Sequence, residues 1–197
     1  MINVSGDDKG KSLIKRANQV FSMSERNNAR ATWEILSEFL LPNQSGIFQG
    51  EDTRGGKKTQ RLFDGTGPMA AHDLASAFQS TLTNPASKWS KIRYKNDLLN
   101  NDNEAVAWLE EVNNIIHEQL SESNFDTMVA KNYQAFTSLG TMALFHEEAD
   151  RDLAGTFNGF RFESWHLATI AFTENKQGSV DSVYRKFKIT AKQAEGS

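Results

Sequence analysis

Two prolines mark the limits of one helix near the middle of the chain, and this helix constrains the fold more than any other segment. Pro68 stands in a first turn, where a missing backbone N–H costs nothing, and Thr66 can cap the amides that begin the helix. Asn84 and Pro85 force the chain out of helical geometry at the other end. The sequence therefore predicts a helix over residues 67–83.

This predicted helix combines one apolar stripe with small flanks. Leu74, Phe78 and Leu82 recur every fourth residue and so share one face of a helix. The flanks are alanines, at Ala70, Ala71, Ala75 and Ala77. Side chains this small let another backbone approach closely, so we predict that a second element packs against this helix.

A strand is predicted directly after this helix. Trp89 leads into an alternating pattern in which Ile92 and Tyr94 point to one side. Basic side chains point to the other side, at Lys91, Arg93 and Lys95. This alternation is typical of a strand that is covered on one face only, so we expect a strand over residues 89–95.

Two further helices are predicted before this segment. Apolar residues recur at helical spacing over residues 9–21 and again from Ala29 to Leu40, before Pro42 ends the pattern. The polar residues between them leave open whether the two helices are continuous through Ser24. Residues 43–60 are rich in glycine and polar side chains, which indicates a loop.

Two longer helices follow, and both have recognisable ends. Asn101 or Asp102 can cap the first, and Glu104 lies three residues after Asn101 as in a capping box. Asn124 can cap the second, and Gly140 suits its carboxyl-terminal stop. Their apolar stripes consist of Ala105, Trp108, Leu109, Val112, Ile115, Ile116 and Leu120, and of Phe125, Met128, Val129, Tyr133, Phe136 and Leu139.

The period of the apolar residues changes to two from Thr141 onward. The strand-like segments are TMALF, FRFESW, LATIAFT and VDSVYRKFKIT, and turn residues 175–178 precede the last of them. We therefore predict a small, mainly antiparallel sheet and an α+β fold, with helices first and strands last. We expect residues 1–61 to hold the amino-terminal helices and the loop, and residues 62–197 to hold the α+β part of one structural unit.

Composition excludes several classes of protein. A chain of 197 residues can bury one sizeable core or two small ones. Because it contains no cysteine, it has no disulfide, thiolate nucleophile or cysteine-bound zinc. This fits a reducing compartment or indifference to redox state, and a cytosolic origin is favoured. The polar start and the lack of a long apolar run predict neither a signal peptide nor a membrane span. A net charge of -3 argues against binding nucleic acid by wholesale phosphate neutralisation.

The acidic run after the first strand-like segment contains metal-ligand side chains, at His146, Glu147, Glu148, Asp150 and Asp152. Its spacing is not that of a helical HExxH motif, and no second histidine lies near it in sequence. We interpret it as a solvated loop between two strands and predict no metal site. A metal-dependent hydrolase built on this run is the least favoured of three hypotheses.

The predicted loop contains the densest basic patch of the chain, at Arg54, Lys57, Lys58 and Arg61. Its GGKKT segment resembles the end of a phosphate-binding loop, but Asp52 or Thr53 stands where the first glycine of that motif belongs. We therefore reject nucleotide binding there. The patch is a candidate contact with DNA or an acidic partner, and the alternative is a solvated loop tip.

No catalytic set can be assembled from the sequence. The DGTG segment differs from an aspartic protease motif because Gly65 separates Asp64 from Thr66. The histidines at positions 72, 117 and 166 lie far in sequence from any supported nucleophile. We predict a protein that is not an enzyme and that has no cofactor.

Five distinctive segments occur in one order along most of residues 26–193. They are ATWEILSEFLLP with Trp33 and Pro42, LFDGTGPMAAHDLASAFQSTLTNPASKWSKI, VAWLEEVNNIIHEQLSESNF, AFTSLGTMALFHEE and GSVDSVYRKFKITAKQ. As a set they resemble the head-to-tail connecting, or portal, proteins of short-tailed, podovirus-type bacteriophages. Members of that family are several hundred residues long, so the chain is similar to the amino-terminal, wing-side portion of a portal subunit.

The resemblance implies a structural subunit without catalytic residues. It implies a ring, typically dodecameric, at the unique capsid vertex of the virion, with a central channel for double-stranded DNA during packaging and ejection. The implied partners are other copies of the chain, the major capsid protein, the large terminase subunit and tail adaptor proteins. Assembly in the host bacterial cytoplasm is also implied. The alternative function is a monomeric adaptor or interaction domain of the virion.

Striped or alanine-rich helix surfaces suit packing between subunits of such a ring. We therefore expect the subunit interface on the helix at residues 67–83 and on the helix pair at residues 103–139. The candidate interface residues are Ala71, Ala75, Phe78, Trp108 and Tyr133.

Overall fold

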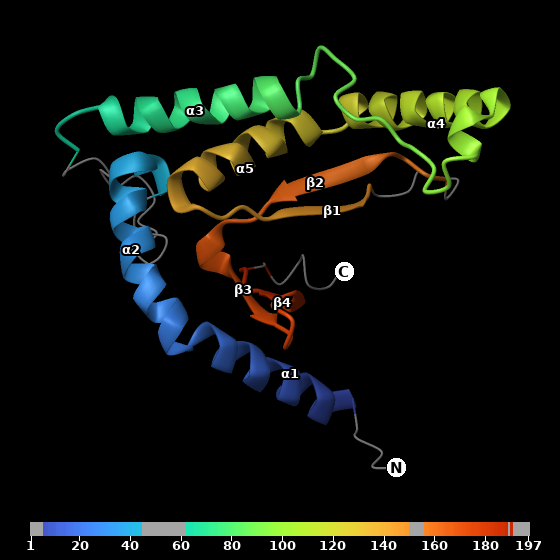
Figure 1. Cartoon of the computed structure of the whole chain (residues 1–197). Helices are drawn as coiled ribbons and strands as arrows, with labels where there is room; N and C mark the ends of the chain where they lie inside the picture. Colours follow the sequence, from blue (N-terminus) through green and yellow to red (C-terminus); the bar gives the residue numbers. More distant parts are fainter. Residues whose placement is uncertain (1–5, 45–61, 150–155, 189, 191–197) are drawn as a thin grey trace. The chain divides into compact units, whose positions relative to one another are not determined.

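A computed structural model describes residues 6–44, 62–149, 156–188 and 190 (Figure 1). Helices precede strands along the chain, so the predicted α+β class is confirmed. The described residues form two compact units, one within Gly65–Trp165 and the other within Met1–Asp64 and His166–Ser197. This division groups the last strands with the amino-terminal helices, whereas the sequence suggested a boundary at residue 61.

The unit within Gly65–Trp165 contains α3 (Thr66–Leu82), α4 (Asn103–Glu122), α5 (Phe125–Leu139), β1 (Leu144–Glu148) and β2 (Phe160–Ser164). Helices α3 and α5 lie side by side (Figure 1). The predicted close packing of the small-residue helix is thus confirmed, and its partner is a helix of the same chain.

The contact between α3 and α5 is made by alanines and by polar side chains that reach the neighbouring backbone. Ala71 and Ala75 are buried, the latter with 5% of its surface exposed. The Thr137 hydroxyl donates to the carbonyl of Ala71 at 3.2 Å. The Gln79 amide donates to the carbonyl of Asp126, also at 3.2 Å. These bonds hold the two helices in one register along their length.

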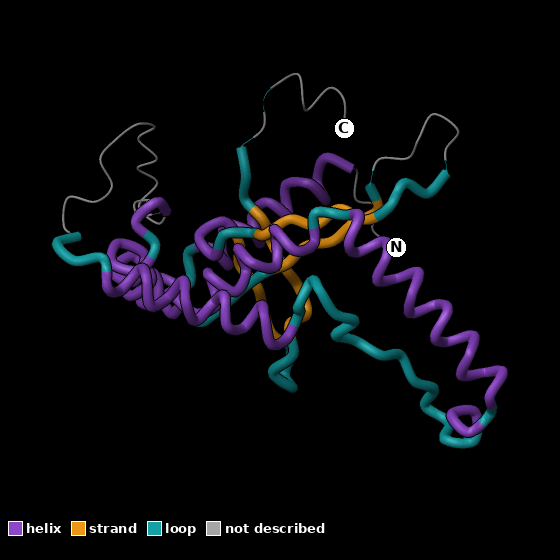
Figure 2. The backbone as a smooth tube through the Cα atoms, turned by 90° about the horizontal axis from the view of Figure 1, so that it is seen from above, coloured by secondary structure: helices purple, strands orange, loops and turns teal. Residues whose placement is uncertain are grey.

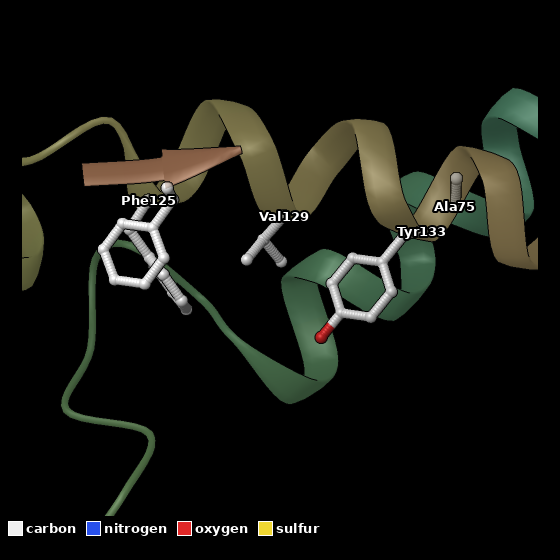
Figure 3. Close-up of a cluster of buried hydrophobic side chains, with 5 residues drawn as sticks. Ala75, Phe125, Val129 and Tyr133 are labelled. Atoms are coloured by element: carbon white, nitrogen blue, oxygen red, sulfur yellow. The ribbon is translucent and has the colours of Figure 1, made fainter. Parts of the chain in front are cut away.

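The core of this unit forms where α5 meets α3 and β2. Figure 3 shows Phe125, Val129 and Tyr133 projecting from α5, with Ala75 nearby. Phe162 of β2 completes the cluster, and its ring meets the edge of Phe125 at a centroid distance of 5.1 Å. Aromatic pairs of this kind add specific geometry to the burial of apolar area.

Some of the helix caps that the sequence predicts are present in the structure, and others are not. Gly65 occupies the N-cap position of α3, so the capping role predicted for Thr66 is wrong. Asp102 caps α4, and its carboxylate accepts a hydrogen bond of 3.0 Å from the backbone amide two residues later. The alternative cap at Asn101 is therefore wrong. Gly140 ends α5 in the left-handed region with φ of 75°, as its sequence position predicts.

The strands form two separate two-stranded antiparallel sheets where one small sheet was predicted. In the first, β1 pairs with β2 from Leu144 opposite Ser164 to Glu148 opposite Phe160. The strand thus begins and ends later than the TMALF segment. His146 and the two glutamates after it lie in β1, so the prediction of a loop is wrong for them.

The other unit combines α1 (Gly6–Phe21) and α2 (Ser24–Leu40) with a hairpin of β3 (Ile170–Glu174) and β4 (Val180–Arg185). The two helices are separated by a turn at residues 22–23, so they are not continuous. Short 3-10 turns follow α2 at η1 (Pro42–Gln44) and precede β3 at η3 (Leu167–Thr169). Helix α1 contacts β3, and the buried side chains of this unit include Val20, Leu41, Leu167, Ile170 and Ala171.

His166 caps the short turn η3. Its Nδ1 accepts a hydrogen bond of 3.1 Å from the backbone amide of Ala168, so this nitrogen carries no proton in the folded chain. Burial lowers the pKa of His166 below its ordinary value of 6.5, because desolvation disfavours the charged imidazolium. The fold therefore favours the neutral histidine.

The first prediction concerns the contact between α3 and α5. Replacing Ala75 by Phe places a large ring where the two helices touch, and we expect a loss of about 1 to 3 kcal/mol in the free energy of unfolding. Ala77→Phe is the matched control, because Ala77 is exposed on the same helix. Urea unfolding measures both variants. Equal losses would show that the burial of Ala75 is not the cause.

The second prediction concerns His166. Since its folded pKa lies below its unfolded value, the associated stability is fully present above pH 6.5 and decreases as the pH falls from there toward the folded pKa. His166→Asn keeps a side-chain acceptor before η3 but does not titrate, so its urea midpoint should depend less on pH in this range. His72→Asn, the same substitution at an exposed position, is the matched control. An unchanged pH dependence in His166→Asn would contradict the assignment.

Candidate subunit-interface surfaces

The chain between α3 and α4 runs as an extended segment beside α4 (Figure 2). Its anchor is Ser90, whose carbonyl accepts a hydrogen bond of 3.2 Å from the side-chain amide of Asn113. The ring of His117, one turn further along α4, places Nε2 3.1 Å from the Ser90 hydroxyl. The predicted strand at residues 89–95 is wrong, because the segment bonds to helix side chains and not to a neighbouring strand.

Two more contacts hold the ends of this segment. The indole of Trp89 stacks on Phe125 of the core, with centroids 5.8 Å apart and nearly parallel planes. At the other end, the Asn100 side chain accepts from the amide of Tyr94 at 3.0 Å and donates to its carbonyl at 2.9 Å. Residues 91–93 lie between these anchored positions.

A groove of about 450 Å³ separates residues 88–93 from α4. Its charged side chains are three cations and one carboxylate, namely Lys88, Lys91, Arg93 and Glu110. Lys91 lies 3.7 Å from Glu110, and both are exposed, so this ion pair contributes little to stability. Asn113 is buried in the groove wall, and its side-chain oxygen has no hydrogen-bond partner within the described residues. The groove is therefore positively charged, with one buried acceptor.

Helix α4 presents an apolar ridge on its outer face. Trp108 is 57% exposed and Ile115 is 52% exposed, and the two lie seven residues apart on one side of the helix. Leu109 and Asn113 face the other way and are buried. Exposed aromatic side chains are enriched at protein interfaces, so this ridge is a candidate contact surface.

A side chain covers the outer edge of β2 in the first sheet. The Asn124 side chain donates to the carbonyl of Phe162 at 2.8 Å and accepts from its amide at 2.9 Å, so it covers the outer edge of β2. Asn124 makes no cap bond to α5, and the predicted capping role is wrong. The Ser123 hydroxyl instead accepts from the first amide of α5 at 3.1 Å.

Comparison with known proteins decides the family. A family model described as bacteriophage head to tail connecting protein matches residues 11–197. The chain belongs to this family. The resemblance found in the sequence is confirmed, and the role of the family is structural.

Two portal proteins are among the relatives of this connector chain. It is 29% identical over 181 residues to the portal protein of Salmonella phage epsilon15, covering 92% of this chain and 31% of that protein. It is 26% identical over 184 residues to the probable portal protein of Bordetella phage BPP-1, covering 93% of this chain and 32% of that protein. The chain thus spans about a third of the length of these relatives. Both matches support a virion component.

Some of the predicted interface residues lie in the core, and others lie at the surface. Ala71, Ala75 and Tyr133 are buried within the connector chain, and Phe78 is half-buried with its ring stacked on Tyr133. Trp108 alone of the five is largely exposed. A subunit interface at these helices stays a prediction, and its accessible apolar side chains include the ridge on α4 as well as Leu74 and Leu82 on α3.

The other predicted sites have different outcomes. Arg54, Lys57, Lys58 and Arg61 lie outside the described residues, as do Asp150 and Asp152, so a contact at the basic patch stays a prediction. Within β1, Glu147 is 3.3 Å from Arg161 of β2. The described residues contain no group of three or more His, Cys, Asp or Glu side chains that could hold a metal ion. None of the described helices is long and apolar enough to cross a membrane.

Sequence reasoning missed two features of these surfaces. The first is on α4. Asn113 and His117 lie one turn apart on its buried side, and such a polar pair inside an apolar stripe is a signal for a bound neighbouring segment.

The second is on the hairpin of β3 and β4. Phe172 and Val183 lie opposite each other on these strands, and both are substantially exposed. Their period-two positions put them on one face, which the sequence analysis did not single out.

The third prediction tests the cover on β2. Asn124→Ala removes both bonds to the backbone of Phe162, and we expect a loss of about 1 to 2 kcal/mol in the free energy of unfolding together with faster hydrogen exchange at the Phe162 amide. Asn103→Ala, at an exposed position in α4, is the control. Unchanged exchange at Phe162 in the Asn124 variant would contradict the role assigned to this side chain.

Proposed function

We propose that this chain is part of a portal subunit, which forms a ring at the unique capsid vertex and a channel for double-stranded DNA. The observation that carries the proposal is the family match over residues 11–197. Two relatives named as portal proteins support it. The ring is typically dodecameric in such proteins. Its subunits dock the large terminase subunit during packaging and tail adaptor proteins afterwards, and contact the major capsid protein.

The surface of the chain supports self-association. Trp108 and Ile115 expose apolar area along one side of α4, whereas Leu109 and Asn113 on the other side of the same helix are buried. Burying a large aromatic side chain between subunits is a frequent source of binding energy. The ridge is therefore the best candidate for a contact between subunits, which forms only when they assemble.

The charge balance supports a channel through which DNA slides. A net charge of -3 gives no wholesale attraction to phosphate, so DNA is not held along the whole chain. Local contacts are assigned to the basic patch at Arg54, Lys57, Lys58 and Arg61. The protein acts in the virion after assembly in the host bacterial cytoplasm, without catalytic residues or a cofactor.

Self-association separates this proposal from a monomeric adaptor of the virion. The experiment measures the native mass of the full-length gene product at micromolar concentration and images the same sample by negative stain. Closed rings are the expected result. A monomer under these conditions would overturn the proposal and favour the adaptor.

The fourth prediction concerns the ridge on α4. We expect Trp108→Ser to raise the concentration needed for ring formation about tenfold, because it removes a large apolar contact between subunits. The unfolding midpoint should change little, since Trp108 is mostly exposed in the single chain. Leu98→Ser, another exposed apolar position, is the control. Normal assembly of Trp108→Ser would place the interface elsewhere.

A further inference from the structure

The hydrogen-bond pattern shows which backbone groups of β1 point away from its partner strand. The amide of Trp165 donates to the carbonyl of Ala143, and the amide of Ala149 donates to the carbonyl of Gly159. In an antiparallel pair, residues alternate between bonding to the partner and pointing outward. The residues of β1 at even positions, Leu144 and His146 among them, therefore direct their N–H and C=O groups away from β2.

The two outer edges of this sheet differ. On β2, the outward groups of Phe162 are both bonded to the side chain of Asn124. On β1, the outward groups of Leu144 and His146 meet no such side chain among the described residues. An open strand edge is a template for another strand, so β1 can pair with one at Leu144 and His146.

A second open stretch of backbone lies in the same unit. Residues 91–93 are extended between the anchored positions Ser90 and Tyr94, and their backbone groups make no hydrogen bond within the described chain. They border the groove in which the oxygen of Asn113 is buried without a partner. Its orientation is set because the nitrogen of the same amide donates to Ser90. An incoming extended segment suits the backbone groups of residues 91–93, whereas the oxygen of Asn113 is closed off from solvent.

The two open stretches have opposite charge. Among the described residues near β1, three carry carboxylates, namely Glu147, Glu148 and Glu163, and Arg161 carries a guanidinium. Beside residues 91–93, the cations of Lys88, Lys91 and Arg93 outnumber the carboxylate of Glu110. Complementary charge favours pairing between these surfaces and sets which surfaces meet. Two β1 edges, by contrast, would bring like charges together.

We propose that the β1 edge of one copy pairs as a strand with residues 91–93 of the neighbouring copy. This inference rests on the proposed ring. Because it joins two different surfaces of identical chains, the contact is heterologous, which is the kind of contact that builds closed rings. Main-chain bonds supply affinity in such strand addition, and the charged side chains supply register and partner choice.

Cysteine cross-linking tests the pairing directly. These 197 residues contain no cysteine, and any cysteine elsewhere in the full-length gene product is first replaced by serine. In the full-length gene product, His146→Cys is combined in turn with Lys91→Cys, Ile92→Cys and Arg93→Cys. After oxidation, at least one combination should give a ladder of linked subunits on a non-reducing denaturing gel. Each single-cysteine variant is the control and should give no ladder, since a heterologous contact brings together two different positions.

Images of the same samples separate this inference from the proposed function. Rings without a ladder in any of the three combinations would overturn the strand pairing and leave the ring in place. Absence of rings in the unsubstituted protein would overturn both. A ladder together with rings is the expected result.

Charge reversal gives an independent readout. Arg93→Glu should reduce the fraction of protein in rings, because it places an acidic side chain opposite the acidic edge. Adding Glu148→Lys to the same chain should restore rings by exchanging the two charges. Lys131→Glu, on α5, changes the net charge by the same amount and should have little effect. Failure of Glu148→Lys to restore assembly would count against the pairing.

Discussion

Close contact between α3 and α5 is the constraint on which the rest of the described unit depends. Ala71 and Ala75 allow the two helices to touch, and this contact closes one side of the aromatic core on α5. The ring of Phe125 contacts the rings of Trp89 and Phe162. The same helix therefore positions both the extended segment and the sheet. A larger side chain at either alanine would separate the elements that define the surface.

Asparagine side chains complete this unit where regular structure ends. Asn100 and Asn124 each make two hydrogen bonds to the backbone of one residue, and Asn113 makes one. A side-chain amide carries the same donor and acceptor as a peptide group, so it can satisfy backbone atoms that no strand reaches. These bonds satisfy some stretches of backbone, whereas among the described residues the outward groups of Leu144 and His146 and the backbone of residues 91–93 make no hydrogen bond.

The two sides of α4 have different roles in the proposed ring. One side must hold the extended segment through Asn113 and His117, and the other exposes Trp108. Periodicity predicted that Trp108 lies on an apolar stripe, but it also assigned Ala71 and Tyr133 to a subunit interface. The structure buries those two side chains within the chain, because α3, which carries Ala71, and α5, which carries Tyr133, pack against each other in the same molecule. A stripe in a sequence does not say which neighbour will cover it.

The sequence by itself determined the helices and their main limits. These limits depend on steric and hydrogen-bonding effects within a few residues. Examples are the prolines around α3, the cap at Asp102 and the left-handed stop at Gly140. Tertiary structure alone decided that the alternating residues 89–95 bond to a helix and that Asn124 covers a strand. An alternating segment becomes a strand only where another strand edge lies alongside it, and that edge comes from a distant part of the chain.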